Sequence, residues 1–179
     1  MGQYYSPVSI EKKEHVYSHD YGSGLKLMEH SWMKNNFVRA VETLIAKDGA
    51  WHGDHIVWAG DYADPEPEII DPRDSTKKVN LFFICESEKR NPEIPDDDVD
   101  FRYLVNITKM EFVDKTKVPY DRDGWQIHPL PLLTCEGNGR GGGDYHGESQ
   151  LIGAWARDVI FATNDEPANC KEIIFDLIE

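Results

Sequence analysis

One stretch of this chain has the periodicity of an amphipathic helix, and its isolation restricts what the rest can form. Between Ser31 and Lys47 the apolar residues recur at the spacing of one helix face, and they are Phe37, Val38, Val41, Leu44 and Ile45. Asn35 or Asn36 can cap the start of this helix, and Gly49 follows its last turn. Nothing on it has catalytic character, so we interpret it as a core-packing helix.

The remaining apolar segments are short, and most have the alternation or the aromatic and β-branched content of strands. We expect strands at 4–10, 15–21, 25–29, 101–107, 110–118, 125–133, 155–163 and 173–178, while 79–84 fits either a strand or a helix. Pro129 and Pro131 reduce 128–131 to an edge or irregular extended segment. Hairpin-length turns without a βαβ rhythm predict a single α+β domain over residues 1–179, with a mostly antiparallel sheet and one or two packing helices.

Two segments of the chain, 49–61 and 153–165, resemble each other. In both, a turn delivers a tryptophan, a charged residue follows, and an apolar run ends in an acidic turn. The segments are either pseudo-equivalent strands of one sheet or a chance likeness, because a repeat architecture would contain three or more copies. The identical positions are Gly49/Gly153, Ala50/Ala154, Trp51/Trp155, Asp54/Asp158, Ile56/Ile160 and Asp61/Asp165.

The composition argues against several classes of partner. A formal net charge of −14 and a sequence pI near 4.8 disfavour binding to nucleic acid or to an anionic membrane. The cysteines, Cys85, Cys135 and Cys170, are widely spaced, so we expect neither a disulfide framework nor a zinc ribbon. No apolar run approaches the length of a membrane span. We therefore expect a cytoplasmic protein.

The segment 136–147 is rich in glycine, and its other side chains can form hydrogen bonds. Glycine lets a backbone approach a ligand closely, so its amides could surround a phosphate or carboxylate together with Arg140. Asp144 could accept from ribose-like hydroxyls, and Tyr145 could stack on a base. A surface loop without a ligand is the alternative interpretation. The candidate ligand-binding residues are Asn138, Gly139, Arg140, Gly141, Asp144, Tyr145, Trp58, Asp61 and Tyr62.

Catalytic sets are harder to find in this sequence. His52, Asp54 and His55 are close in sequence, but on an extended chain His55 faces away from the other two. The spacings of known metallohydrolase motifs are absent, so we expect no metal, no cofactor and no catalytic residue. Cys135 stands beside Glu136 without a basic neighbour, and we expect an inert thiol.

Several motifs together resemble a family of small proteins from bacteriophages and gut-type bacteria. These motifs are Met1–Tyr5, Tyr17–Tyr21, Gly24–Glu29, Val57–Asp64 and His128–Tyr145, and the resemblance covers nearly the whole chain. It implies an accessory phage or prophage protein that acts in the bacterial host cytoplasm. Small phage proteins with polar, glycine-lined pockets are similar in character to sponges that sequester nucleotide immune signals. The resemblance supplies no catalytic residues.

Three functional hypotheses follow from these observations. The leading one is a non-catalytic, homo-oligomeric protein that binds and sequesters a phosphate-bearing small molecule, such as a cyclic ADP-ribose derivative or a cyclic oligonucleotide, as an anti-defence function. The alternative is a metal-assisted phosphodiesterase or nucleotide hydrolase that uses His52, Asp54, His55, Asp61 and Asp144. The third is an acidic interaction protein that mimics nucleic acid and inhibits a host enzyme.

Overall fold

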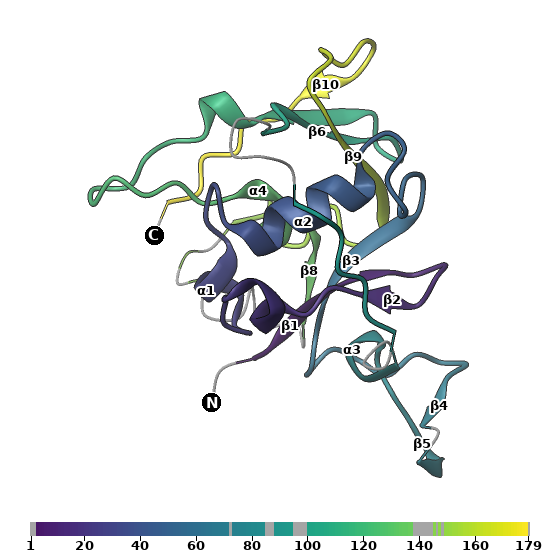
Figure 1. Ribbon diagram of the computed structural model, residues 1–179. Coiled ribbons are helices and arrows are strands. Elements are labelled where there is room, and N and C mark those ends of the chain that lie inside the picture. The colour runs from purple at the N-terminus through teal and green to yellow at the C-terminus, as the bar shows by residue number, and fades with distance from the viewer. Residues whose placement is uncertain are drawn as a thin grey trace.

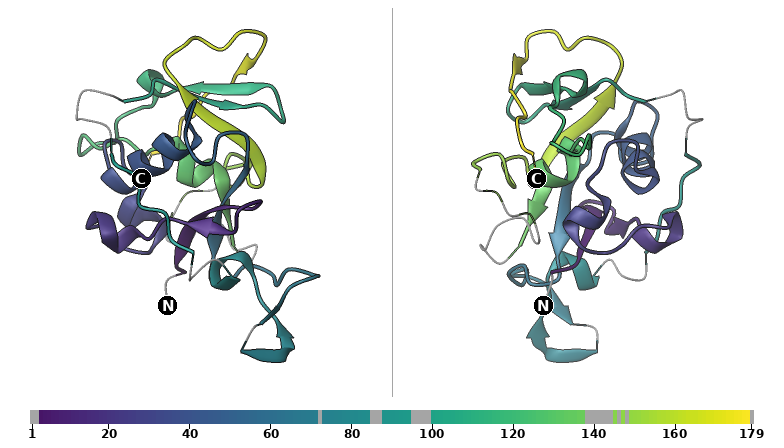
Figure 2. Two further views of the ribbon diagram at one scale, coloured as in Figure 1. Left: turned by 45° about the vertical axis from the view of Figure 1, so that its right-hand side comes forward. Right: turned by 90° about the vertical axis from the view of Figure 1, so that its left-hand side faces the viewer.

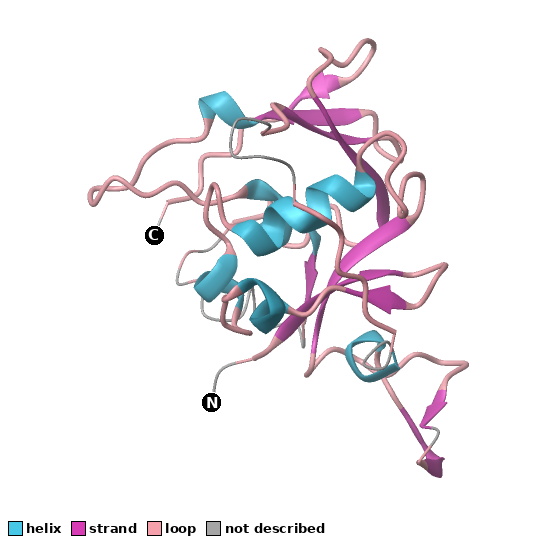
Figure 3. Cartoon of the chain, viewed as in Figure 1, coloured by secondary structure: helices cyan, strands magenta, loops and turns pink. Residues whose placement is uncertain are grey.

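Eight strands form one mixed, mostly antiparallel sheet in the computed structural model of the chain, which confirms the predicted α+β class (Figure 1, Figure 3). The structure describes residues 3–71, 73–84, 88–94, 100–137, 145, 147 and 149–178. Within these residues the strand order is β10-β7-β6-β9-β3-β1-β2, and β8 pairs with β3 from outside this path. The strands of the sheet are β1 (Tyr5–Ser9), β2 (Glu14–His15), β3 (His55–Gly60), β6 (Tyr103–Asn106), β7 (Glu111–Asp114), β8 (Cys135–Glu136), β9 (Asp158–Thr163) and β10 (Lys171–Glu172).

The predicted amphipathic helix is present as α2 (Asn36–Ile45). Asn35 caps it, because its Oδ1 accepts a hydrogen bond from the backbone N–H of Phe37 at 2.9 Å. Gly49 is not the residue directly after the last turn, as the sequence predicted, since the helix already ends at its C-cap Ala46. Gly49 instead lies against the carbonyl oxygens of the last turn, where a Cβ would come within 2.4 Å of Thr43 O. The other helices are α1 (Leu27–His30), α3 (Leu81–Ile84), α4 (Pro129–Thr134) and the 3-10 helices η1 (Ser18–Tyr21) and η2 (Lys115–Lys117).

Four segments predicted as extended are partly helical. Within 15–21, Ser18–Tyr21 form η1, and within 110–118, Lys115–Lys117 form η2. Residues 25–29 enter α1, because the backbone N–H of Lys26 donates to Glu29 Oε2 at 3.0 Å and fixes the first turn. Residues 128–131 enter α4, because a proline in the first turn of a helix loses no hydrogen bond there. His128 caps this helix, and its Nδ1 accepts from the N–H of Leu130 at 3.2 Å.

The expected last strand over 173–178 is also wrong. The strand that forms is β10, which pairs in parallel with β7 before this segment begins. Phe175 and Leu177 are buried, whereas Ile174 and Ile178 are exposed. The alternation that suggested a strand is therefore real, but it serves burial against the core rather than strand pairing.

The two segments that resemble each other in sequence lie next to each other in the sheet. β3 and β9 pair in antiparallel fashion, with His55 opposite Val159 and Ile56 opposite Asp158. His55 and Val159 are also matching positions of the two segments. A pseudo-two-fold axis therefore passes through this pair, and the segments are pseudo-equivalent strands of one sheet.

The equivalence extends to the hairpin that precedes each segment. The β1–β2 and β6–β7 turns both contain a left-handed residue with φ of 53°, Lys13 in one and Met110 in the other. Each hairpin also contacts the strand of its own half in the same way, so the likeness is structural. The matching hydrogen bonds and ion pairs are Trp51–Glu14 and Trp155–Glu111, Ser9–Asp54 and Asn106–Asp158, and Lys12–Asp54 and Lys109–Asp158.

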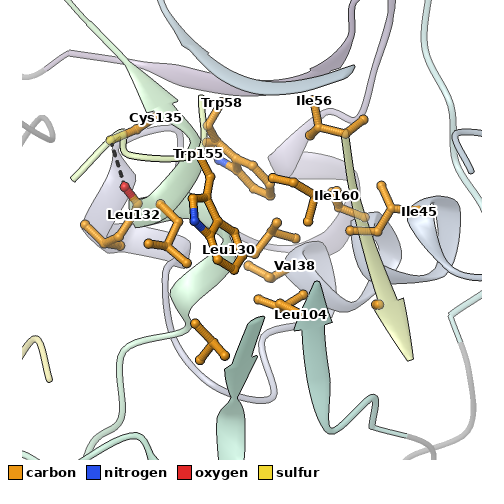
Figure 4. Packing of buried hydrophobic residues seen from close by; sticks show 14 of the residues in the cluster. Val38, Ile45, Ile56, Trp58, Leu104, Leu130, Leu132, Cys135, Trp155 and Ile160 are labelled. Atoms are coloured by element: carbon orange, nitrogen blue, oxygen red, sulfur yellow. Dashed lines mark hydrogen bonds between the residues drawn. The ribbon is translucent and has the colours of Figure 1, made fainter. Parts of the chain in front are cut away.

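Each half of the molecule thus consists of a hairpin, a helix and a strand. The first half contains β1, β2, α2 and β3, and the second contains β6, β7, α4 and β9. The halves interlock, because α2 packs against β9 and α4 packs against β3. Trp58 and Trp155 meet apolar side chains of both halves in one buried cluster (Figure 4).

A separate two-stranded sheet leaves the main body after β3. It is formed by β4 (Ile70–Asp71) and β5 (Asp74–Lys78), which pair with each other and project beside α3 (Figure 1, Figure 2). Most of its residues are exposed. This projection borders the candidate site described next.

Candidate functional site

Strands β3 and β8 are parallel neighbours, so their carboxyl ends reach the same edge of the sheet. β3 leads into Asp61 and Tyr62, and β8 leads into Gly137 at the start of the glycine-rich segment. Both strands run downwards in Figure 1 towards α3. The fold thus brings two predicted binding residues to the beginning of the predicted binding loop.

Gln3 lies at the base of this edge, between the two turns. A Cβ on Gly60 would lie 2.3 Å from Gln3 Nε2, and a Cβ on Gly137 would lie 2.8 Å from Gln3 Oε1, so the two glycines leave room for the amide. Gln3 Oε1 accepts a hydrogen bond from the Tyr5 hydroxyl at 3.0 Å. Gln3 Nε2 is buried and has no hydrogen-bond partner among the described residues. A buried donor of this kind is uncommon and costly, so the edge holds a position suited to an acceptor.

The turn after β3 presents a fixed carboxyl group. Asp61 Oδ1 accepts a hydrogen bond from the N–H of Tyr4 at 2.9 Å. Burial raises the pKa of Asp61 above its ordinary value, although backbone hydrogen bonds oppose the shift. Asn80 Nδ2 holds the turn by donating to the carbonyl oxygens of Asp61 and Ala63 at 3.1 and 3.0 Å. Tyr62 is 44% exposed, so its ring is open to a ligand.

A cavity of about 340 Å³ lies beside Asp61, between the turn and the β4–β5 projection. Its size falls at the lower end of small-molecule pockets. Arg73 and Lys78 place two cations on its wall, and Lys78 has no ion-pair partner among the described residues. Phe83, also on the wall, is 40% exposed. The cavity thus combines two cations, an aromatic ring and two carboxyl groups, because Asp71 also lies on its wall and pairs with Arg73 at 3.3 Å.

Arg157 fixes the start of the glycine-rich segment. Its guanidinium donates two hydrogen bonds of 2.6 Å to the Glu136 carboxylate in β8 and another of 2.5 Å to Glu66. These bonds to two carboxylates raise the pKa of Arg157 above its ordinary value. Arg157 therefore ties β8 to the segment that leads to β4, and it holds both sides of the edge together.

Trp58, a predicted ligand-binding residue, lies in the core. Its side chain is fully buried, and its indole N–H donates to His30 Nε2 at 2.9 Å. His30 Nδ1 lies 3.0 Å from the carbonyl oxygen of Gly24, so the ring carries its proton on Nδ1 and accepts through Nε2. Trp58 supports the edge from below and does not line it.

Tyr145, another predicted binding residue, is held against the C-terminal segment. Its hydroxyl donates to the carbonyl oxygen of Ile178 at 3.2 Å, and its ring lies where a Cβ on Gly147 would be. The predicted binding residues that fall outside the described part of the chain are Asn138, Gly139, Arg140, Gly141 and Asp144.

Four residues of the enzymatic alternative occupy both ends of β3, and the fifth, Asp144, falls outside the described part of the chain. His52, Asp54 and His55 lie at its amino-terminal end, whereas Asp61 follows its carboxyl end. Asp54 accepts from the Ser9 hydroxyl at 2.7 Å, as part of the pseudo-symmetric framework. Over the ranges that the structure describes, no three His, Cys, Asp or Glu side chains are grouped to hold a metal ion.

The Cys135 thiol has the environment of an inert group. Burial raises its pKa to about 12, against backbone hydrogen bonds that lower it. Its Sγ donates to the carbonyl oxygen of Leu132 at 3.3 Å (Figure 4). The thiol therefore stays protonated at neutral pH.

Sequence reasoning missed Gln3, Arg157 and the two cations of the cavity. Arg157 left a signal, because it replaces Gly53 in the near-repeat at a turn that both halves make with positive φ, 66° and 85°. A bulky cation at a turn that favours glycine indicates a specific contact. Gln3 left no signal, since the start of the chain resembled the first strand.

Comparisons with protein-family models, with curated proteins and with solved structures found no match for this chain. In the described residues, no helix is both long and apolar enough to cross a membrane.

Proposed function

We propose that the protein binds and sequesters a phosphate-bearing small molecule at the edge where β3 and β8 end. The parallel pairing of these strands carries the proposal, because it joins Asp61 and Tyr62 to the start of the glycine-rich segment. The family resemblance suggests that the ligand is a nucleotide immune signal of the bacterial host. The protein would then act in the host cytoplasm as an anti-defence factor.

The chemistry around this edge suits such a ligand. Arg73 and Lys78 can contact phosphate oxygens, and their charge offsets the acidic character of the chain locally. The open rings of Tyr62 and Phe83 can stack on a base. Gln3 Nε2 can donate to a ligand acceptor that enters between the two turns. Arg140 would add a further phosphate contact from the glycine-rich segment.

Isothermal titration calorimetry with cyclic oligonucleotides and ADP-ribose derivatives tests the proposal. We expect one member of the panel to bind, and Arg140→Ala to weaken its binding by about 2–3 kcal/mol. Lys78→Ala should also weaken binding. Lys171→Ala is the matched control, because this exposed lysine lies on β10, outside the cavity, and its loss should leave affinity unchanged.

The fate of the ligand separates sequestration from catalysis. Ligand that is recovered intact after the complex is denatured supports sequestration. A cleaved product whose formation stops with EDTA would establish the metal-assisted phosphodiesterase instead. If no phosphate-bearing compound binds and a host enzyme is captured in a salt-sensitive complex, the protein is an acidic inhibitor.

A further inference from the structure

Two tryptophans form an exposed aromatic pair far from this edge in the fold. Trp125 is 60% exposed, Trp32 is half-buried, and their ring centroids are 5.8 Å apart with planes inclined by 60°. Trp125 belongs to the long connection between η2 and α4, which extends to the left in Figure 1. The β4–β5 projection lies on the opposite side of that view. An exposed pair of large rings with this geometry needs an explanation, because single exposed rings are ordinary but clusters are not.

A hydrogen bond holds the Trp32 indole in place, and backbone hydrogen bonds hold the segment that carries Trp125. The Trp32 indole N–H donates to the carbonyl oxygen of Met28 at 2.6 Å. Trp125 is fixed through its backbone, which donates to Asp121 Oδ1 at 2.8 Å and accepts from the N–H of Asp121 at 2.8 Å. The two segments meet where Met33 N–H donates to the carbonyl oxygen of Gln126 at 3.0 Å. The Trp32 ring and the backbone of Trp125 are therefore preorganised before any ligand arrives, and the Trp125 ring packs against Trp32.

The two rings border an open cavity of about 560 Å³. The other lining residues are Asp121, Arg122 and Asp123, so carboxylates outnumber cations on its wall. Arg122 is 90% exposed at its side chain and contacts Asp123 at 3.6 Å. The chain as a whole carries a formal net charge of −14, so the field around this wall favours cations.

We propose that this aromatic corner binds a quaternary or methylated ammonium group. The face of an indole attracts a cation through its quadrupole, and Trp is the strongest such partner among the aromatic residues. Two inclined indoles form two walls of an aromatic cage, and Asp121 and Asp123 supply the charge. A methylated ammonium fits better than a lysine ammonium, because it is weakly hydrated and the rings offer it no hydrogen-bond acceptor.

Choline and its neutral analogue 3,3-dimethylbutan-1-ol form the matched pair of probes, since they have the same shape and differ in charge. Titration of the full chain, followed by the indole N–H signals of ¹⁵N-labelled tryptophan, measures both affinities. We expect choline to bind at least about tenfold more tightly and to shift the Trp125 signal. Equal affinity of the two probes, or binding of glucose in place of choline, would overturn the proposal.

Single variants distinguish cation binding in an aromatic cage from binding to an apolar surface. Trp125→Ala should weaken choline binding by about tenfold or more, and Asp123→Asn should weaken it less. Arg122→Ala should strengthen choline binding, because it removes from the cavity wall a positive charge that repels the choline cation. Tyr120→Ala is the control, since this ring is 68% exposed nearby but does not line the cavity. An Arg122→Ala variant that binds choline more weakly would contradict the electrostatic argument.

Discussion

At the scale of single residues, the least expected group is a buried charged cluster between the two halves. Glu42 on α2 accepts from Lys115 Nζ and lies 3.3 Å from His128 Nε2, and the side chains of all three are at most 4% exposed. Burial alone would raise the pKa of Glu42, but the neighbouring Lys115 and His128 lower it to about 2. Burial lowers the pKa of His128, and its Nδ1 already accepts from α4, so the ring is neutral with its proton on Nε2.

Glu42→Gln tests how much the fold depends on this cluster. The substitution leaves Lys115 as an uncompensated buried charge, so we expect the free energy of unfolding to fall by about 3–5 kcal/mol at pH 7. Urea denaturation measures it. Asp123→Asn is the control, because its contact with Arg122 is exposed and should contribute little. A cost for Glu42→Gln no larger than that of the control would contradict the prediction.

The same cluster contributes to the pH dependence of stability. His128 is harder to protonate in the folded state than in the unfolded state, so its contribution to stability declines as the pH falls below about 6.5. Glu42 contributes fully above its ordinary pKa of 4.5, and this contribution is lost as the pH falls towards about 2. The free energy of unfolding should therefore fall in two stages as the pH is lowered. Glu42→Gln should reduce the fall in the more acidic stage.

At the scale of elements, the near-repeat makes a paired prediction. Asp54 accepts from Ser9 and Lys12 as Asp158 accepts from Asn106 and Lys109. Asp54→Ala and Asp158→Ala should therefore each lower the free energy of unfolding by about 1–3 kcal/mol, and by similar amounts.

Asp165→Ala is the control for this pair, because Asp165 matches Asp61 in the near-repeat but is exposed. Equilibrium unfolding in urea compares the three variants. If one of the two buried aspartates could be removed without loss, the pseudo-equivalence would not extend to energetics.

Helices and strands were predictable from the sequence where the spacing of apolar residues matches the face that the element buries. The stripe on α2 and the pairing of the two hairpins were predicted correctly, because apolar residues recur at the period of the element that buries them. The bounds of the first hairpin were not, since β2 ends at His15 and the expected strand over 15–21 continues into η1. α4 was missed because prolines suggest an extended chain unless the cap is known, and the capping atom is a His128 nitrogen. The near-repeat could be noticed in the sequence, but its meaning required the pairing of β3 with β9.

At the scale of the whole molecule, the β4–β5 projection should be the least protected part of the described chain. It pairs with itself alone, and its residues are largely exposed. Hydrogen exchange measured by mass spectrometry should show early exchange there and late exchange in β3 and β9. The β6–β7 hairpin is the internal control, since it is also a hairpin but lies within the eight-stranded sheet. Equal protection of the two hairpins would contradict the prediction.

The sequence predicted the segments that form the candidate site better than the individual residues that line it. The glycine content indicated 136–147 as a candidate binding segment, and Asp61 was chosen as a further binding residue. Tertiary pairing could not be inferred, yet the pairing of β3 with β8 brings Gly60 and Gly137 to Gln3, and the β4–β5 projection brings the cations beside Asp61. Trp58 was chosen for its ring, yet a ring of that size is as useful to the core, where it lies.

The reciprocal packing of α2 on β9 and of α4 on β3 restricts how this protein can evolve. A substitution that displaces either helix therefore exposes a strand of the other half, so each half depends on the other to bury its strand. The edge at the end of β3 is different, because β8 borders it in parallel while, among the described residues, no parallel strand borders the end of β9. Substitutions at this edge can therefore change one half while both halves keep the framework that they share.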